Sequence, residues 1–291
     1  MNAQSILLVG DKGMLAHAIK RSLDARGITS ITGVDVHNCD ITDIPQIQMW
    51  FEDVEPRLVI NCAAFTNVDA CESKIDVADA VNGTGVGNLA AVCRDHGATL
   101  VHFSTDYVFD GTLRRPLRPD DPVGPASAYG RSKLLGESLL QKNAPPRWLI
   151  IRTAWLYGPN GPNFPQAILN AAKAGKPLRV VNDQFGSPTF TFDLAEATLD
   201  LLDRGASGVW HVANSGQTHW HEFAQAVLAA FGVEAPVEAI TSTDWAKIKP
   251  GAAVRPAYSV FDLAPFERLT GRRMPDWRDA LGRYRAAIQT A

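Results

Sequence analysis

Residues 6–16 have the sequence Ile-Leu-Leu-Val-Gly-Asp-Lys-Gly-Met-Leu-Ala. The four apolar residues predict a buried strand, and the apolar spacing from Met14 to Arg26 predicts a helix directly after the turn. Glycines in such a turn let the backbone approach a phosphate, and the helix N-terminus supplies free N–H groups and partial positive charge. The segment therefore favours a dinucleotide-binding turn, with an ordinary strand-to-helix turn as the alternative. The cofactor contacts that we predict in it are Gly10, Lys12, Gly13, Met14 and Leu15.

Short apolar runs alternate with helical stretches through the first 155 residues, a rhythm typical of a parallel sheet. The expected strands cover residues 6–9, 31–36, 58–61, 99–104 and 148–152, and the expected helices include 14–26, 44–54 and 78–96. We therefore predict an α/β protein with a Rossmann-type doubly wound parallel sheet and helices on both faces. The pattern changes after Tyr157, which predicts an NAD(P)-binding domain at 1–157 and a smaller α/β substrate-binding domain at 158–291. A helix near 193–203 is expected to return to the first domain.

Composition narrows the function classes. The 291 residues carry a formal net charge of −3, which gives no overall attraction to nucleic acid or to an anionic membrane. No apolar run approaches the roughly 20 residues that a membrane span needs, and no signal peptide precedes the first strand. The four cysteines form no CxxC pair, so we predict neither a zinc site nor a disulfide framework, and a cytoplasmic location. The oligomeric state stays open, and a homodimer is compatible with the sequence.

Further cofactor contacts are expected beyond the glycine turn. Asp35 lies near the end of the second predicted strand, where an acid accepts hydrogen bonds from the adenine ribose of NAD, although a turn residue is the alternative. Lys12 could instead serve a 2′-phosphate, so the choice between NADH and NADPH stays open. Asp40 and Ile41 belong to the segment 40–43, which is expected either to edge the adenine pocket or to cap the next helix. The third predicted strand is followed by three small residues, Cys62, Ala63 and Ala64. They are expected to lie where a cofactor would pass, and tight packing alone is the alternative.

A phenol and an ammonium stand four residues apart at Tyr129 and Lys133, so on a helix both face the same ligand. A neighbouring cation favours the phenolate, which would bring Tyr129 from its usual pKa of about 10 closer to acid–base work. Thr105 ends the preceding strand, at the same edge of the predicted sheet, with Ser104 as the rival hydroxyl. Three groups thus converge on one carbonyl: Tyr129 to protonate it, Thr105 to polarise it and Lys133 to tune Tyr129.

The chain resembles the dTDP-4-dehydrorhamnose reductases of the extended short-chain dehydrogenases over nearly its whole length. The segments that carry the resemblance are 61–72, 104–109, 129–133, 152–158, 182–189 and Arg255-Pro256. The resemblance implies reduction of the C4 keto group of a dTDP-linked 6-deoxy sugar by NADPH or NADH, giving dTDP-L-rhamnose, with Thr105, Tyr129 and Lys133 catalytic. It also implies a substrate pocket formed by Val68, Thr105, Asp106, Tyr107 and Trp155, with Arg255 on the diphosphate. For Trp155, a core aromatic is the alternative.

Some positions depart from the family pattern. The glycine turn carries Met14 and ends in Ala16, and the segment 81–85 is unusually rich in glycine. A sugar-nucleotide 4,6-dehydratase would need a second acid directly after Asp106, and this chain has Tyr107 there, so this activity is not expected. An epimerase and a regulatory subunit resembling methionine adenosyltransferase beta remain alternatives. His219 and His221 alternate near a predicted helix start and are interpreted as solvated or capping groups, so no metal is predicted.

Overall fold

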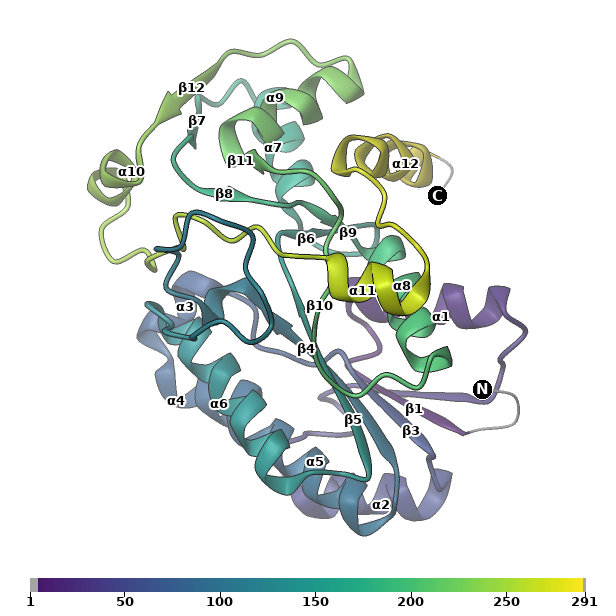
Figure 1. Ribbon diagram of the computed structural model, residues 1–291. Coiled ribbons are helices and arrows are strands. Elements are labelled where there is room, and N and C mark those ends of the chain that lie inside the picture. Colours follow the sequence, from purple (N-terminus) through teal and green to yellow (C-terminus); the bar gives the residue numbers. More distant parts are fainter. Residues whose placement is uncertain (1–4, 290–291) are drawn as a thin grey trace.

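The computed structural model describes residues 5–289, and its largest sheet has six parallel strands in the order β10-β5-β4-β3-β1-β2 (Figure 1). The strands are β1 (Ile6–Val9), β2 (Ile31–Val34), β3 (Leu58–Asn61), β4 (Thr99–Thr105), β5 (Arg147–Thr153) and β10 (Gly208–His211). The chain order reverses between β1 and β3, because β2 lies on one side of β1 and all later strands lie on the other. Such a reversal opens a crevice at the carboxyl ends of the strands. The predicted Rossmann-type sheet is confirmed.

Helices cover both faces of this sheet. On one face lie α1 (Met14–Ala25), α8 (Thr191–Asp203) and α11 (Ala264–Thr270), and on the other lie α2 (Ile44–Val54), α5 (Gly85–Asp95) and α6 (Ala128–Asn143). Side chains of β1 alternate between the two cores, with Ile6 and Leu8 in the first and Leu7 and Val9 in the second. Both faces are therefore apolar, which explains why the parallel strands appear in the sequence as continuous apolar runs.

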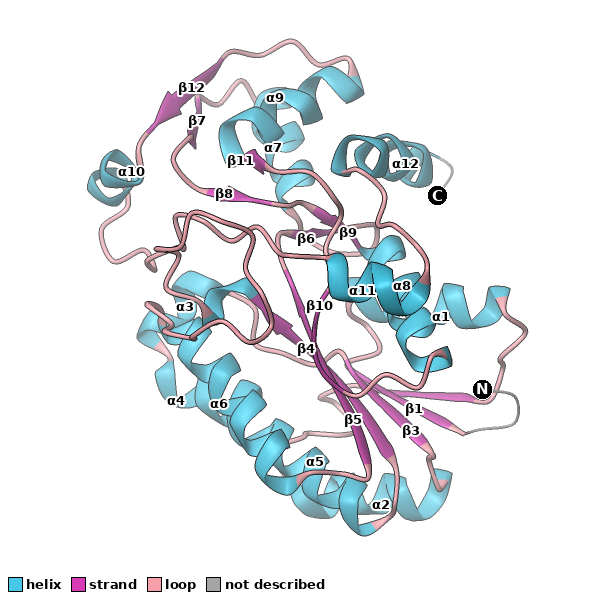
Figure 2. Ribbon diagram, in the orientation of Figure 1, coloured by secondary structure: helices cyan, strands magenta, loops and turns pink. Residues whose placement is uncertain are grey.

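Most of the chain after β5 forms a smaller lobe above the sheet (Figure 2). Its elements are β6 (Leu156–Tyr157), α7 (Phe164–Lys173), β7 (Leu178–Val181), β8 (Phe185–Gly186), β9 (Thr189–Phe190), β11 (Thr218–His219), α9 (Trp220–Phe231), β12 (Val237–Ile240), α10 (Ser242–Ile248) and α12 (Trp277–Gln289). Aromatic side chains dominate its core, where Tyr157 contacts Phe190, Phe223 and Tyr284. The chain leaves this lobe for α8, which packs against α1, and for β10, which pairs with β5.

The connection between β3 and α5 differs from the single helix expected at 78–96. It consists of α3 (Val68–Ser73), α4 (Ile75–Ala78) and the π-helix η1 (Asp79–Thr84) before α5 begins. Asn82 in η1 is fully buried; its side chain donates to Phe65 O and Ser132 Oγ and accepts from Phe65 N. Close packing against α6 explains the glycine-rich sequence, because a Cβ at Gly83 would lie 2.5 Å from the Leu135 side chain.

The second strand is also shorter than expected, ending at Val34 instead of residue 36. Asp35 begins a tight turn, in which its backbone N–H donates to Asn38 Oδ1 and its carbonyl accepts from Cys39 N. Val36 is consequently exposed, with 62% of its surface accessible. The apolar pattern alone could not separate this turn residue from the strand.

No helix among the described residues is both long and apolar enough to cross a membrane.

Candidate active site

A cavity of about 530 Å³ lies at the carboxyl ends of β3, β4 and β5, beside the turn that follows β1. The predicted site residues that line it are Lys12, Gly13, Met14, Leu15, Cys62, Ala63, Ala64, Val68, Thr105, Asp106, Tyr107, Tyr129, Lys133 and Trp155. Five predicted contacts are not among its lining residues: Gly10, Asp35, Asp40, Ile41 and Arg255. The fold thus gathers the glycine turn, the strand-end hydroxyl and the Tyr129–Lys133 pair around one space.

The glycine turn brings the start of α1 against this cavity. Gly13 is the N-cap residue and offers no side-chain acceptor to the helix, so the first N–H groups of α1 stay available to an anion. Gly10 has φ +76°, and a Cβ there would lie 2.6 Å from the backbone nitrogen of Ala63. Gly10 therefore allows the turn to pass close to the backbone of Ala63. The geometry of the turn fits the pyrophosphate of a dinucleotide.

Replacing Gly10 with alanine is expected to destabilise the protein and to weaken cofactor binding. The positive φ costs about 1 kcal/mol for any L side chain, and the clash with Ala63 adds to it. Gly27→Ala is the matched control, because Gly27 has φ +70° and nothing within 4 Å of its Cβ position. Urea unfolding with and without NADPH measures both effects. Equal losses in the two variants would contradict a role for the close approach to Ala63.

Three of the predicted adenine-side residues lie beyond the cavity. Asp35 Oδ2 accepts a hydrogen bond from Lys12 N at 3.3 Å, which places this carboxylate beside the glycine turn. Asp40 Oδ1 accepts from both the backbone and the hydroxyl of Thr42, so it stabilises a turn. Ile41 is buried against the position of Gly85. Asp43 is the N-cap residue of α2, but its carboxylate accepts from the Gln46 side chain and caps no backbone N–H.

Helix α6 holds Tyr129 and Lys133 on its first turns. Its N-cap Ser127 accepts from Gly130 N, and Glu72 Oε1 accepts from Ala128 N, so both neighbours of Tyr129 are anchored. A Cβ at Gly130 would lie 2.2 Å from Tyr107 O, and only glycine permits this approach of α6 to the end of β4. Tyr107 and Tyr129 consequently meet edge to face, with ring centroids 5.5 Å apart.

Lys133 follows Tyr129 by four residues in α6 and is buried. Its Nζ donates to Phe103 O at 2.7 Å and lies 3.2 Å from Nε2 of the fully buried His102. Burial lowers the Lys133 pKa to about 8, although the Glu137 carboxylate opposes this shift. We expected Lys133 to lower the pKa of Tyr129. The direction is the reverse, because burial and the charge of Asp106 raise it above its usual range, so Tyr129 is a phenol at neutral pH.

Thr105 and Asp106 complete the polar part of the cavity. Thr105 Oγ1 donates to Asp106 Oδ1 at 3.0 Å and accepts from Tyr107 N at 3.2 Å. The Thr105 hydroxyl opposes the rise of the Tyr129 pKa, but burial outweighs it. Asp106 Oδ2 is buried without a hydrogen-bond partner among the described residues, and burial raises the Asp106 pKa to about 6.

A second cavity of about 440 Å³ adjoins the first at Tyr107. Its lining includes the aromatic residues Phe164, Trp220 and Trp245 and the cations Arg179 and Arg255. Between the two cavities, Trp155 stacks on Trp220 with centroids 3.6 Å apart and rings 8° from parallel. Trp155 is therefore a cavity-lining aromatic that also packs against the core of the lobe.

Arg255 is held in place by Asp69, a residue that is distant from it in the sequence. Asp69 Oδ1 accepts from Arg255 and from Ala253 N, and Asp69 Oδ2 accepts from Lys249. Burial would raise the pKa of Asp69, but the two cations outweigh it and hold the pKa below its usual value. This carboxylate, next to Val68 in α3, ties the segment 249–255 to the sheet domain.

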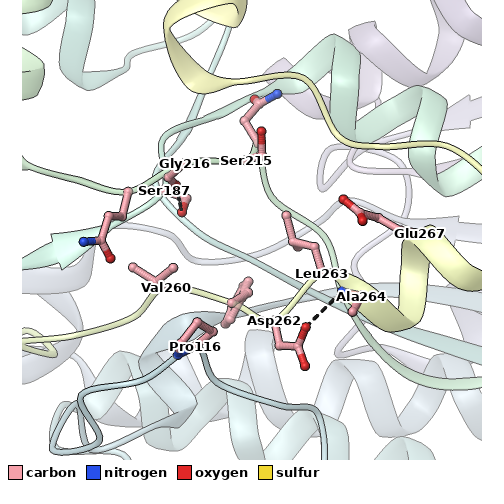
Figure 3. A pocket seen from close by; sticks show the side chains of 12 residues that line it. Pro116, Ser187, Ser215, Gly216, Val260, Asp262, Leu263, Ala264 and Glu267 are labelled. Carbon is pink, nitrogen blue, oxygen red and sulfur yellow. Dashed lines mark hydrogen bonds between the residues drawn. The ribbon is translucent and has the colours of Figure 1, made fainter.

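A third cavity of about 340 Å³ shares no lining residue with the other two. In it, Pro116 and Ser187 face the start of α11 (Figure 3). Asp262 Oδ1 accepts from Ala264 N at its edge. None of the residues predicted from the sequence lines this cavity.

Three residues of the site were not predicted. His102, the partner of Lys133, gave a usable signal, because it lies two residues before Ser104 on a strand that runs toward the site. Trp220 lies between His219 and His221, and neither Trp220 nor Trp245 carries a local signal of its role. His219 itself is the N-cap of α9, where its Nδ1 accepts from Glu222 N, so the capping interpretation is confirmed.

Comparisons with known proteins were consistent with this site. The family model described as "RmlD substrate binding domain" matches residues 4–290. The chain is 39% identical to the spore coat polysaccharide biosynthesis protein SpsK of Bacillus subtilis, over 96% of each chain. It is 38% identical to a dTDP-4-dehydrorhamnose reductase of Streptomyces griseus, over 94% of this chain and 91% of the relative.

A solved structure gives the same result. The dTDP-4-dehydrorhamnose reductase of Bacillus anthracis, in complex with NADP, superposes with a TM-score of 0.92 at 32% identity. The superposition covers 98% of this chain and 99% of the other. The chain therefore belongs to the dTDP-4-dehydrorhamnose reductase family of the extended short-chain dehydrogenases.

Proposed function

We propose that this protein uses NADPH or NADH to reduce the C4 keto group of dTDP-4-dehydrorhamnose, giving dTDP-L-rhamnose. The observation that carries the proposal is one cavity lined by both the glycine turn and the three groups Thr105, Tyr129 and Lys133. Relatives at 36–38% identity are named for this reductase activity.

The glycine turn and the start of α1 would hold the pyrophosphate, and Lys133 would hold the nicotinamide ribose. A bound reduced nicotinamide supplies the hydride that the ketone carbon accepts. Tyr129 donates its proton to the developing alkoxide, and its raised pKa keeps that proton in place beforehand. Lys133 has Phe103 O and His102 as fixed partners, which leaves donor capacity for a ribose hydroxyl.

The second cavity suits the nucleotide part of the substrate. Aromatic rings of Phe164, Trp220 and Trp245 offer stacking surfaces to a base, and Arg255 offers a guanidinium to a diphosphate. Tyr107 lines both cavities, so a sugar linked to that diphosphate would reach Tyr129. We propose on this basis that residues 1–157, with α8, hold the cofactor and that residues from 158 onward supply the nucleotide site.

Asp69→Asn is expected to raise KM for the nucleotide sugar about tenfold, with little change in kcat. The neutral amide holds Arg255 less firmly, and a contact that acts on substrate and transition state alike appears in KM. Lys249→Gln is the control, because Lys249 shares the same carboxylate but is not among the lining residues of either cavity. Steady-state kinetics give both constants. A fall in kcat with unchanged KM would contradict this role.

The function is tested by mixing purified protein with a dTDP-4-keto-6-deoxy sugar and following the loss of NADPH or NADH absorbance. Oxidation of either cofactor supports the reductase and settles the cofactor preference between the Lys12 and Asp35 interpretations. Cofactor binding without turnover would refute it and favour the regulatory alternative. An epimerase would convert the sugar without net consumption of cofactor.

We also propose a reducing compartment such as the cytoplasm as the place of this reaction. All four cysteines are free thiols, and burial raises the pKa of Cys39 to about 11. Thiols of this kind are stable where disulfides do not form.

A further inference from the structure

The segment 242–255, which contains α10, has almost no buried side chain. None of the residues of α10 is buried. Within 242–255, all of which the structure describes, only Ala253 is buried. The apolar side chains of Ile248 and Val254 are 48% and 63% exposed. Burial of apolar surface therefore does little to hold this segment in place.

Close contacts anchor the chain at both ends of this segment. At the first end, Asp183 accepts hydrogen bonds from the backbone N–H of Ser242 at 2.8 and 3.0 Å and from its hydroxyl at 2.7 Å. Because that hydroxyl gives its only proton to Asp183, it accepts from Gln184 Nε2 at 2.8 Å. Just beyond the other end, a Cβ at Gly111 would lie 2.6 Å from Ala257 N, so the two backbones pack directly on each other.

Between these anchors, one carboxylate ties the segment to the sheet domain. Asp69 in α3 accepts from the side chains of Lys249 and Arg255 and from Ala253 N. The side chains of this cluster are open to water, with Lys249 51%, Arg255 23% and Asp69 21% exposed. Ion pairs that water reaches contribute little to stability. The attachment at Asp69 can therefore break while the two anchors stay in place.

The same segment forms part of the wall of the second cavity. Trp245 of α10 and Arg255 line this cavity together with Phe164 and Trp220. Figure 1 shows α10 at the outer edge of the upper lobe. Asp69 sets one negative charge against two cations, so positive charge remains for an anionic ligand. A nucleoside diphosphate in the cavity would thus supply the apolar and ionic contacts that the segment lacks.

We propose that residues 243–255 form a lid over the second cavity, which Asp69 latches and which a bound nucleoside diphosphate holds closed. The inference rests on the nucleotide site proposed above. In the free protein the latch opens and closes, so that the nucleotide sugar enters and the product leaves. With nucleotide bound, opening of the lid also breaks the contacts of the base with Trp245 and of the diphosphate with Arg255.

Hydrogen exchange of the full-length protein with and without dTDP tests the closure, with dTDP binding measured by calorimetry. Amides of residues 243–252 are expected to exchange at least about tenfold more slowly at saturating dTDP, because the ligand opposes an opening that breaks its own contacts. Amides of α2, which packs on the sheet domain, are the control and should change little. Unchanged exchange in 243–252 would overturn the proposal. Equal slowing in α2 would also overturn it, because global stabilisation would then explain the effect.

Asp69→Asn tests the latch in the absence of any ligand. The neutral amide forms no ion pair with Lys249 or Arg255, so the amides of 243–252 are expected to exchange about fivefold faster than in the wild type. Asp76→Asn is the matched control, because both acids lie in the first turn of a short helix and Asp76 is exposed, with no ion pair among residues 5–289. Equal exchange rates in the two variants would overturn the latch.

Trypsin gives a second measurement of the closed lid. Lys247 in α10 is 72% exposed, whereas cleavage after Lys249 is blocked by Pro250. Cleavage after Lys247 is expected to slow when dTDP is bound, and an unchanged rate would contradict the lid. A protein that binds dTDP without closure loses only the lid, and one that binds no dTDP loses both the nucleotide site and the lid. Oxidation of NADPH or NADH by the nucleotide sugar tests the reductase function separately.

Discussion

Tyr129→Phe is expected to lower the rate of ketone reduction by about 10³-fold while leaving cofactor binding close to that of the wild type. The phenyl ring keeps the edge-to-face contact with Tyr107, and only the hydroxyl is lost. Burial holds the Tyr129 pKa above its usual range, so the hydroxyl carries its proton at neutral pH and is the group that can supply it to the alkoxide.

Single-turnover absorbance changes and cofactor titration by fluorescence measure the two effects separately. Tyr107→Phe is the matched control, because it removes a hydroxyl from the other ring of the same pair. A Tyr129→Phe variant that retains more than about a tenth of the wild-type rate would exclude Tyr129 as the general acid. A loss of cofactor binding would instead indicate damage to the cavity.

Glu137→Gln is expected to lower the free energy of unfolding by about 3–5 kcal/mol, the largest stability effect that we predict. Glu137 and Arg152 form a bidentate pair, with N···O distances of 2.7 and 2.9 Å and side chains only 2% and 5% exposed. The substitution leaves the Arg152 guanidinium as an uncompensated buried charge. Arg152 also donates to Pro119 O and lies over the Phe109 ring, so it has little freedom to reach water.

Urea unfolding of Glu137→Gln beside Glu238→Gln tests this expectation. Glu238 pairs with Arg179 on the surface, with side chains 62% and 52% exposed, and its loss should cost at most about 1 kcal/mol. Equal effects in the two variants would contradict the prediction. Glu137 also opposes the fall in the Lys133 pKa, so the variant should lower that pKa further.

The parts of the site that were predictable depend on short stretches of sequence. The glycine turn between β1 and α1 and the four-residue spacing of Tyr129 and Lys133 are local patterns with a fixed geometry once the strand and helix form. Strand ends are also predictable, because parallel strands bring their carboxyl ends to one edge. Thr105 entered the prediction in this way.

Other features depend on contacts between distant segments, which no local pattern encodes. The hold of Asp69 on Arg255 joins residues 186 positions apart, and the stacking of Trp155 on Trp220 joins α9 to the end of β5. The pKa of Tyr129 was predicted in the wrong direction because the sequence shows a neighbouring lysine but not the burial that outweighs it. The raised pKa of Asp106 was likewise not predictable, because its main cause is burial, which only the fold determines.

The return of the chain to the sheet has a consequence for its synthesis. β10 pairs with β5 along the outer edge, and α11 packs against α8 on the sheet face, although most of the upper lobe lies between β5 and α11 in the sequence. A nascent chain that has emerged only to β5 has an unpaired strand edge, which is a template for association with other chains. The six-stranded sheet is therefore complete only after the ribosome has made β10, and a gene fusion at residue 157 would transfer a sheet that lacks this edge strand.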